Sequence, residues 1–129
     1  MLTARTLIAA ACSTAVVLMS SATRSAEPDA LAVEWQGKKP CERLHEDDQV
    51  RILRCTFPPG AMHVRHSHPP AFTYVLSGGK IQIVDAAGTR VVERETGANA
   101  VGAAVSWHEL TNVGDTTLMF LVVEMKYKK

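Results

Sequence analysis

Short runs of β-forming residues, separated by Gly, Pro and Asn turn signals, fill the chain from Gln49 onward and constrain its fold more than any other feature. Several runs alternate apolar and polar side chains, as a strand with one buried face does. We find no amphipathic helical pattern and no internal repeat there. Regularly spaced short strands are typical of an all-β sandwich or barrel. We predict strands over residues 50–57, 72–77, 80–85, 89–95, 105–113 and 118–125.

The first 26 residues contain no acidic side chain and follow the three-part pattern of a secretory signal peptide. Arg5 supplies the positive charge, residues 7–19 are apolar, and a cleavage site follows Ala22, with Ala26 as a second option. A buried N-terminal helix is the alternative, but no capping signal or polar face accompanies the apolar run. We therefore predict a signal peptide over 1–26 and a periplasmic or secreted protein.

The length and charge of the chain exclude several classes of protein. Its 129 residues suffice for one closed core but not for two. Its 14 Lys and Arg side chains nearly balance 13 Asp and Glu, whereas a nucleic-acid binder would show a basic excess. No apolar stretch reaches the roughly 18–20 residues of a transmembrane helix. We expect an N-terminal arm and first hairpin over 27–48, a barrel over 49–129, and a small molecule as partner.

Two cysteines, Cys41 and Cys55, remain once Cys12 is removed with the leader. An oxidising compartment permits a disulfide between them. Their segments flank a polar turn, and pairing them as a symmetric hairpin about Asp48 sets Cys41 opposite Cys55. A bridge would close a short loop and add on the order of 3 kcal/mol of stability. Two buried free thiols are the other outcome that the sequence leaves open.

The histidines carry the candidate chemistry. His66 and His68 are two residues apart, so on a strand their side chains project from one face. Such a pair can offer two imidazoles to one metal ion, although strands also contain such pairs by chance. A third histidine, His108, lies far along the chain. By strand parity His63 should face away from the pair unless the strand bulges.

Two stretches of the sequence resemble the two motifs of the cupin superfamily. The first has a glycine, five residues, a His-x-His pair and a later strand ending in two glycines: Gly60, His66-Ser67-His68 and residues 74–79. The second keeps the spacing of its Gly, His and Asn: Gly97, His108 and Asn112. Ala103 and Val105 stand where the second motif usually has Pro and Gly. The resemblance spans roughly residues 50–125 and is closest to small single-domain cupins.

This resemblance implies a cupin-type antiparallel β-barrel of the jelly-roll kind, with a metal ion held inside by three His and one Glu. Carried over residue by residue, it assigns His66, His68 and His108 as metal ligands. The Glu has no counterpart, because its position falls on Phe72 or Ala71, depending on the direction of counting. The implied site is three imidazoles around one divalent ion, and imidazole suits Fe, Zn, Ni or Cu.

Further residues are assigned around this site. We name Met62, Phe72, Tyr74 and Phe120 as candidates for lining the pocket, although each also suits the barrel core. Tyr74 is the only one of the four that titrates, and no residue is assigned as catalytic. Trp107 is expected to point outward, where it could contact a second subunit of a homodimer.

The sequence therefore predicts a metal-binding cupin that acts on a small molecule, as a three-His non-haem metal oxygenase or lyase. Three protein ligands leave coordination positions open for such chemistry. The alternative is a non-catalytic module that binds a small molecule or a metal. The missing Glu and the lack of an evident acid or base favour that alternative.

Overall fold

The computed structural model describes residues 26–126, so the predicted leader lies, apart from Ala26, outside the described residues. Within residues 26–126 the chain forms nine strands and no helix, and hence no helix long and apolar enough to cross a membrane. The strands in chain order are β1 (Cys41–Glu46), β2 (Val50–Phe57), β3 (Met62–His68), β4 (Ala71–Ser77), β5 (Gly79–Asp85), β6 (Gly88–Arg94), β7 (Asn99–Gly102), β8 (Val105–Asn112) and β9 (Leu118–Met125).

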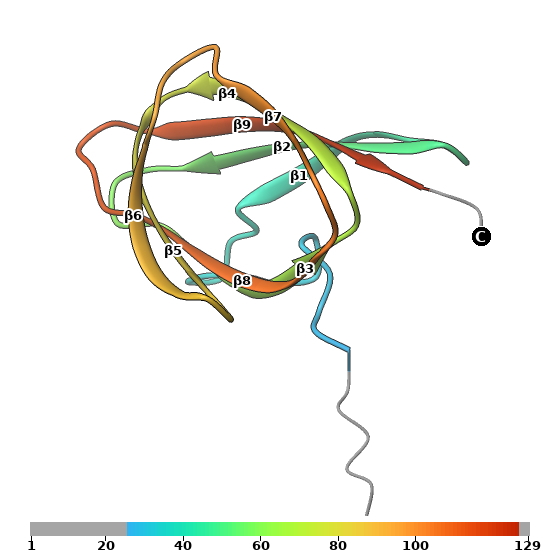
Figure 1. The fold of residues 1–129 in the computed structure, drawn as a ribbon, viewed down its shortest axis with the longest axis horizontal. Helices are drawn as coiled ribbons and strands as arrows, with labels where there is room; N and C mark the ends of the chain where they lie inside the picture. Colours follow the sequence, from blue (N-terminus) through green and yellow to red (C-terminus); the bar gives the residue numbers. More distant parts are fainter. Residues whose placement is uncertain (1–25, 127–129) are drawn as a thin grey trace, which may run out of the picture.

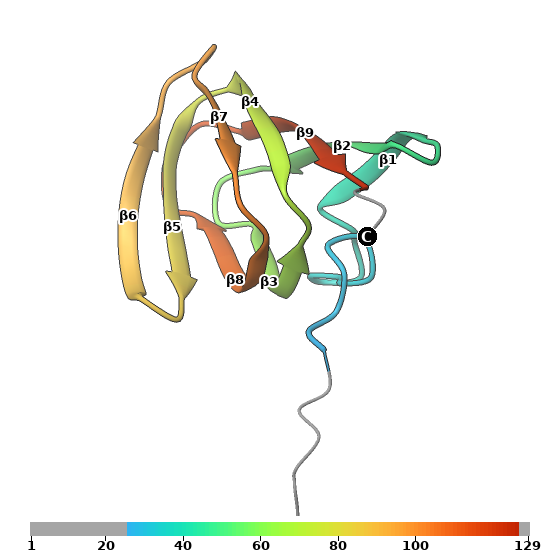
Figure 2. The ribbon, with the colours of Figure 1, turned by 45° about the vertical axis from the view of Figure 1, so that its right-hand side comes forward.

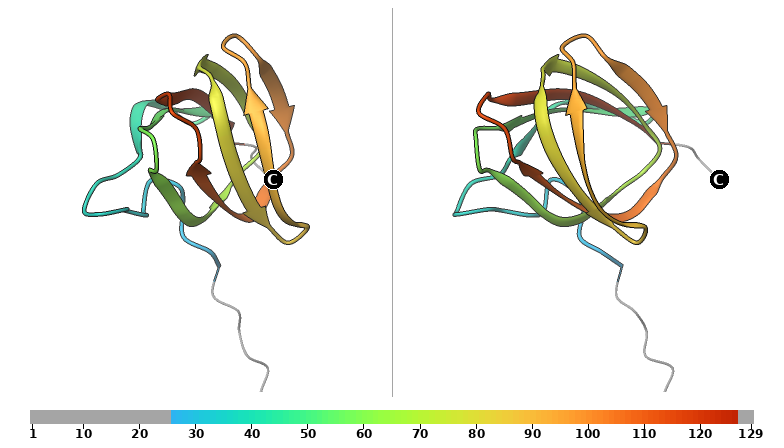
Figure 3. Two further views of the ribbon diagram at one scale, coloured as in Figure 1. Left: turned by 90° about the vertical axis from the view of Figure 1, so that its left-hand side faces the viewer. Right: turned by 60° about the vertical axis from the view of Figure 1, so that its left-hand side comes forward.

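The strands form two antiparallel sheets that face each other and enclose a barrel (Figures 1 and 3). The five-stranded sheet has the order β1-β2-β9-β4-β7, and the four-stranded sheet has the order β3-β8-β5-β6. The last strand in the sequence, β9, thus lies in the middle of the larger sheet, between β2 and β4. The all-β fold predicted from the sequence is confirmed.

All six predicted strands are present, each within one residue of its expected bounds. Two further strands are present: β1 belongs to the hairpin expected around Asp48, and β3 carries the His-x-His pair. No sequence pattern predicts β7, which pairs Gly102 with Ala71 along the edge of β4. This strand has only four residues, Asn-Ala-Val-Gly, and all are exposed, so it shows neither an alternation of buried and exposed residues nor a long apolar run.

The core lies between the sheets and follows from strand parity. Along β9 every second residue is buried, beginning with Leu118 and continuing through Phe120 and Val122. Leu53, Cys55 and Phe57 of β2 face the same interior. The fourth inward position of β9 is Glu124, which is 0% exposed. An acidic side chain at such a position requires buried partners, because an unpaired buried charge is very costly.

The β1–β2 hairpin carries a disulfide between Cys41 and Cys55, whose Cα atoms are paired in the strand register. The register is symmetric about Asp48 from Cys41 to Arg43 and then shifts at a bulge before His45. Both cysteines are buried in the core. The bridge joins residues 14 apart and thereby ties the edge strand β1 to the barrel.

The segment that precedes β1 crosses the end of β3 (Figure 2). The amide of Ser67 donates to the carbonyl of Pro28 at 2.8 Å, and Asp29 forms an isolated bridge with Ser67. Ala30 is 1% exposed and belongs to the core. This N-terminal arm, residues 27–40, therefore packs onto the barrel beside the strand that carries His66 and His68.

Candidate metal centre

Three histidine side chains converge on the inside of the barrel. His66 and His68 come from β3 and His108 from β8, where it is paired with His66 in the register. The Nε2 atom of His66 lies 3.0 Å from Nε2 of His68 and 2.9 Å from Nε2 of His108. All three ligand atoms lie within 4.8 Å of one another. The structure thus brings together the three histidines that the cupin resemblance assigns as ligands.

The second ring nitrogen fixes the tautomer of two of these imidazoles. Nδ1 of His66 lies 2.7 Å from the carbonyl oxygen of Val64, and Nδ1 of His68 lies 2.6 Å from a carboxylate oxygen of Glu124. Both partners accept hydrogen bonds, so in each neutral ring Nδ1 carries the hydrogen and Nε2 carries a lone pair. Two lone pairs that face each other at 3.0 Å repel unless a cation or a proton lies between them. This arrangement fits a bound divalent metal ion.

Burial keeps two of the three imidazoles, His66 and His108, neutral at pH 7. Burial, reinforced by the neighbouring imidazoles, lowers the pKa of His66 to about 2 and that of His108 to about 4. Neutral imidazole is the form that binds a metal ion, because a protonated ring has no free lone pair on either nitrogen. The rings of His66 and His108 are therefore ready to act as ligands at pH 7 without first losing a proton.

Glu124 is the functional residue that the sequence analysis missed. Besides His68, its carboxylate accepts hydrogen bonds from the guanidinium of Arg51 at 2.5 Å. Arg51 also pairs with Asp29 of the N-terminal arm at 2.6 Å. A carboxylate behind a ligating His orients the ring and raises the basicity of its other nitrogen. The parity of β9 could have identified Glu124, since it continues the inward series 118, 120 and 122.

The structure also locates the motif position that lacks its Glu. Of the two alternatives, Ala71 lines the cavity, whereas Phe72 does not. Ala71 is paired with Glu124 across β4 and β9. A methyl group therefore stands where the family pattern has a carboxylate. The carboxylate of the neighbouring strand binds the rear of His68 instead of joining the ligands.

His63 does not face away from the site, because the strand bulges between His63 and His66. It is 1% exposed and its ring stacks on that of His66, with 3.6 Å between centroids. Its Nε2 donates to the carbonyl of Ala30 at 2.8 Å, and its Nδ1 lies 3.8 Å from Sγ of Cys41. Burial lowers the pKa of His63 to about 4. His63 thus supports a ligand from behind and links it to the arm and the disulfide.

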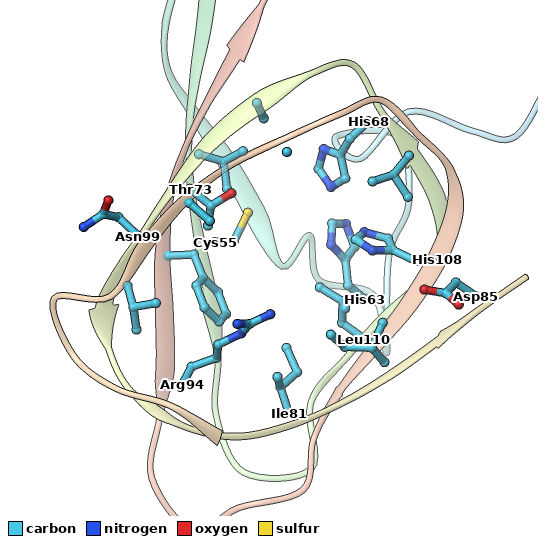
Figure 4. Close-up of a pocket in the computed structure, with 18 of the residues that line it drawn as sticks. Cys55, His63, His68, Thr73, Ile81, Asp85, Arg94, Asn99, His108 and Leu110 are labelled. Atoms are coloured by element: carbon cyan, nitrogen blue, oxygen red, sulfur yellow. The ribbon is translucent and has the colours of Figure 1, made fainter. Parts of the chain in front are cut away.

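A cavity of about 490 Å³ opens in front of the histidines (Figure 4). Of the four residues predicted to line it, only Phe120 does. Phe72 and Tyr74 point the other way, because the alternate residues of β4, Ala71, Thr73 and Val75, face inward. Met62 does not line the cavity either: on β3 it precedes His63, which faces inward.

Charged side chains lie on the β5–β6 side of the cavity. Asp85 and Arg90 line it and form an ion pair at 2.8 Å, which lowers the pKa of the Asp85 carboxyl. Arg94 also lines the cavity. On the outer surface, the guanidinium of Arg65 lies 3.9 Å above the ring of Trp107 and pairs with Glu27 of the arm.

Comparisons with known proteins agree with this architecture. The family model described as "Cupin domain" matches residues 53–124. A cupin domain from Bordetella pertussis Tohama I superposes with a TM-score of 0.64 at 19% identity, covering 67% of this chain and 92% of its own. No curated protein matches the sequence.

Two further solved structures share the fold. An RmlC-like cupin family protein with a double-stranded β-helix fold from Methanocaldococcus jannaschii has a TM-score of 0.56 at 15% identity, covering 71% of this chain and 86% of its own. The polyketide cyclase RemF from Streptomyces resistomycificus has a TM-score of 0.54 at 21% identity, covering 67% of this chain and 64% of its own. At these identities the likeness concerns the fold alone.

Proposed function

The chain belongs to the cupin domain family, and from this premise we propose that it binds one divalent metal ion through His66, His68 and His108 and acts there on a small molecule. The observation that carries the proposal is the convergence of three Nε2 atoms, two of which bear lone pairs held in place by hydrogen bonds at Nδ1. Three neutral imidazoles suit Zn²⁺, Fe²⁺, Ni²⁺ or Cu²⁺ better than a hard ion, because no carboxylate joins them.

A three-ligand site supports oxygenase or lyase-type chemistry. When bound, the metal would serve as a Lewis acid or as an O₂ site, with substrate in the open positions. The residues of the chain would orient the ligands, exclude water and hold the substrate. The cavity walls are mostly apolar, with Val75, Leu110 and Phe120 among them, which suits them to exclude water and to hold a substrate.

A non-catalytic binding module is the second candidate, and one observation favours it. Tyr74, the one titrating residue predicted to line the pocket, faces outward and is 37% exposed. Among the described residues that line the cavity, Asp85 is held by Arg90, and His63 donates to a backbone carbonyl. Neither is free to exchange a proton with a bound molecule. A reaction at this site would then rely on the metal alone.

Metal analysis of the mature protein, purified without a His tag, tests the proposal. We expect about one metal ion per chain in the wild type and a large loss in His108→Ala. Equal metal content in both proteins would refute the metal site. Oxygen uptake and product analysis with thiols, diketones and organic acids then separate the enzyme from the binding module. Turnover that requires the metal supports the enzyme, and binding without turnover supports the module.

We also propose that the protein is periplasmic or secreted and forms a homodimer. The location rests on the leader pattern of residues 1–26. The dimer rests on apolar side chains exposed on the outside of β4 and β7, namely Tyr74, Leu76 and Val101. Light scattering should give twice the mass of the mature chain, and Val101→Asp should halve it. A wild-type mass of one chain would contradict the dimer.

A further inference from the structure

The side chains of β6 that face the barrel include two arginines. Arg90 and Arg94 line the cavity, and Val92 between them packs against the core, so positions 90, 92 and 94 all face inward. Val91 and Glu93 alternate with them on the outside, and Val91 is 58% exposed. Both arginines are exposed to solvent, so they lie where the cavity opens and their charges stay hydrated.

Only one of the two arginines has a charged partner among the residues that the structure describes. Arg90 is paired with Asp85 at 2.8 Å. Arg94 makes no ion pair or side-chain hydrogen bond within residues 26–126, although it lines the same cavity. Figure 4 shows its guanidinium directed into the cavity, on the side opposite His68 and His108. The open side of the cavity thus carries one guanidinium that has no charged partner within residues 26–126 and can meet an entering anion.

An unpaired guanidinium in a cavity indicates what the cavity binds. The guanidinium of an arginine carries a positive charge at every physiological pH. Its planar fork of N–H donors matches the two oxygens of a carboxylate. The cavity volume of about 490 Å³ is that of a small-molecule site. Its lining is mostly apolar and includes Ile81, Leu110 and Phe120.

We infer that the small molecule acted on at this site is an organic monocarboxylate with an apolar body. Its carboxylate binds Arg94, its body packs on the apolar walls, and its far end reaches the three histidines. This inference rests on the proposed function, since it names the substrate class of the same site. Its own basis, the unpaired Arg94, is independent of whether a metal is bound.

Calorimetry with hexanoate, benzoate and phenylacetate tests the inference on the full mature protein, both treated with EDTA and loaded with Zn²⁺. We expect at least one of the three to bind in the metal-free protein, with Arg94→Gln weakening it by at least about tenfold. Hexanamide should bind far more weakly than hexanoate. Arg94→Lys keeps the positive charge but loses the planar set of N–H donors. Its affinity for the carboxylates should therefore lie between those of Arg94→Gln and the wild type.

The matched control is the double variant Asp85→Asn/Arg90→Gln. It removes one cation and one anion from the same wall of the cavity and leaves its net charge unchanged. We expect this variant to bind the carboxylates as the wild type does.

Several results would overturn the inference. These are equal affinity in Arg94→Gln, equal affinity for hexanamide, tighter binding of inorganic phosphate than of any carboxylate, or no binding of the three acids at millimolar concentration. Carboxylate binding that requires Zn²⁺ and ignores Arg94 would place the carboxylate on the metal instead. Failure of the metal proposal looks different: the protein would bind no Zn²⁺, while the metal-free measurements on Arg94 would stand.

Discussion

Ala71 of β4 and Glu124 of β9 are paired directly across the two strands. The family pattern has a metal-binding carboxylate at or next to position 71, and here a methyl group lines the cavity. The carboxylate at the paired position reaches Nδ1 of His68, on the side of the ring away from the other imidazoles. The candidate site therefore has a carboxylate that orients the ring of His68, in place of the acidic ligand that the family pattern would supply.

Replacing Glu124 should weaken the metal site without removing a ligand. In Glu124→Gln the amide oxygen can still accept from His68, but the charge that raises the basicity of the ring is lost. Outer carboxylates of this kind typically contribute 10–100-fold to metal affinity, and we expect a Zn²⁺ affinity lower by about that factor. Competition with a chromophoric chelator measures it.

The control for this change is Glu109→Gln. Glu109 follows His108 in β8 but does not line the cavity. Equal Zn²⁺ affinities in the two variants would contradict the role of Glu124. Urea unfolding of both proteins shows whether a loss in Glu124→Gln arises from unfolding, since Arg51 loses its buried charged partner.

Adding a carboxylate at position 71 should change the metal preference. Ala71→Glu places an acidic side chain at a position that lines the same cavity as His68 and His108. Carboxylate ligands favour hard ions, so the ratio of Mn²⁺ to Zn²⁺ affinity should rise at least tenfold. Ala71→Gln has nearly the same volume without the charge and is the control. A Mn²⁺ affinity that is the same in both variants would show that residue 71 does not reach the ion.

The metal-free protein should lose stability between about pH 6.5 and pH 4. In the unfolded chain a histidine protonates near pH 6.5, whereas in the fold the pKa of His63 is lowered to about 4. The unfolded state therefore binds more protons in this window, and the free energy of unfolding falls as the pH falls. Between pH 7 and pH 5, the lowered pKa of His63 alone should reduce the free energy of unfolding by about 2 kcal/mol.

Urea titrations of the EDTA-treated protein at several pH values measure this slope. His63→Gln keeps a hydrogen-bond donor for the carbonyl of Ala30 but has no group that protonates in this pH range. The free energy of unfolding should therefore fall less steeply with falling pH in this variant. His45→Gln replaces an exposed histidine of β1 and is the control. Hydrogen bonds and neighbouring charges lower the pKa values of Glu46 and Asp47 to about 2, so these carboxyl groups change the stability only below this pH range. A flat profile above pH 5 would contradict the prediction.

Removing the disulfide should destabilise the fold by about 3 kcal/mol, the loop-closure contribution for a loop of this length. The measurement is urea unfolding of Cys41→Ser/Cys55→Ser against the oxidised wild type. A thiol count under denaturing conditions should find no free thiol in the mature wild type. Two thiols per chain would show that the bridge does not form.

Export should shorten the chain at one of two sites. Cleavage after Ala22 leaves Thr23 at the N-terminus, and cleavage after Ala26 leaves Glu27. Intact mass of the protein from a periplasmic extract distinguishes these products. A full-length mass in that fraction, or protein found only in the cytoplasm, would contradict the predicted leader.

The strands were predictable from the sequence, but the face of the sheet on which some side chains lie was not. A long apolar run made β9 predictable to the residue, and the resemblance to the two cupin motifs identified His66, His68 and His108. His63 was assigned the wrong face because a bulge resets the count between it and His66. Phe72 and Tyr74 were expected in the pocket because large apolar residues usually face inward. On β4 the small residues Ala71 and Thr73 face the cavity and leave room for it.

The place of β9 in the larger sheet has a consequence for biosynthesis. The group that orients His68 lies near the end of the last strand, which inserts between two strands made much earlier. A nascent chain thus carries its three imidazoles long before the carboxylate behind one of them emerges. The proposed site is therefore complete only when the whole polypeptide has been made, and a chain truncated before β9 would lack both the middle of its larger sheet and the carboxylate behind His68.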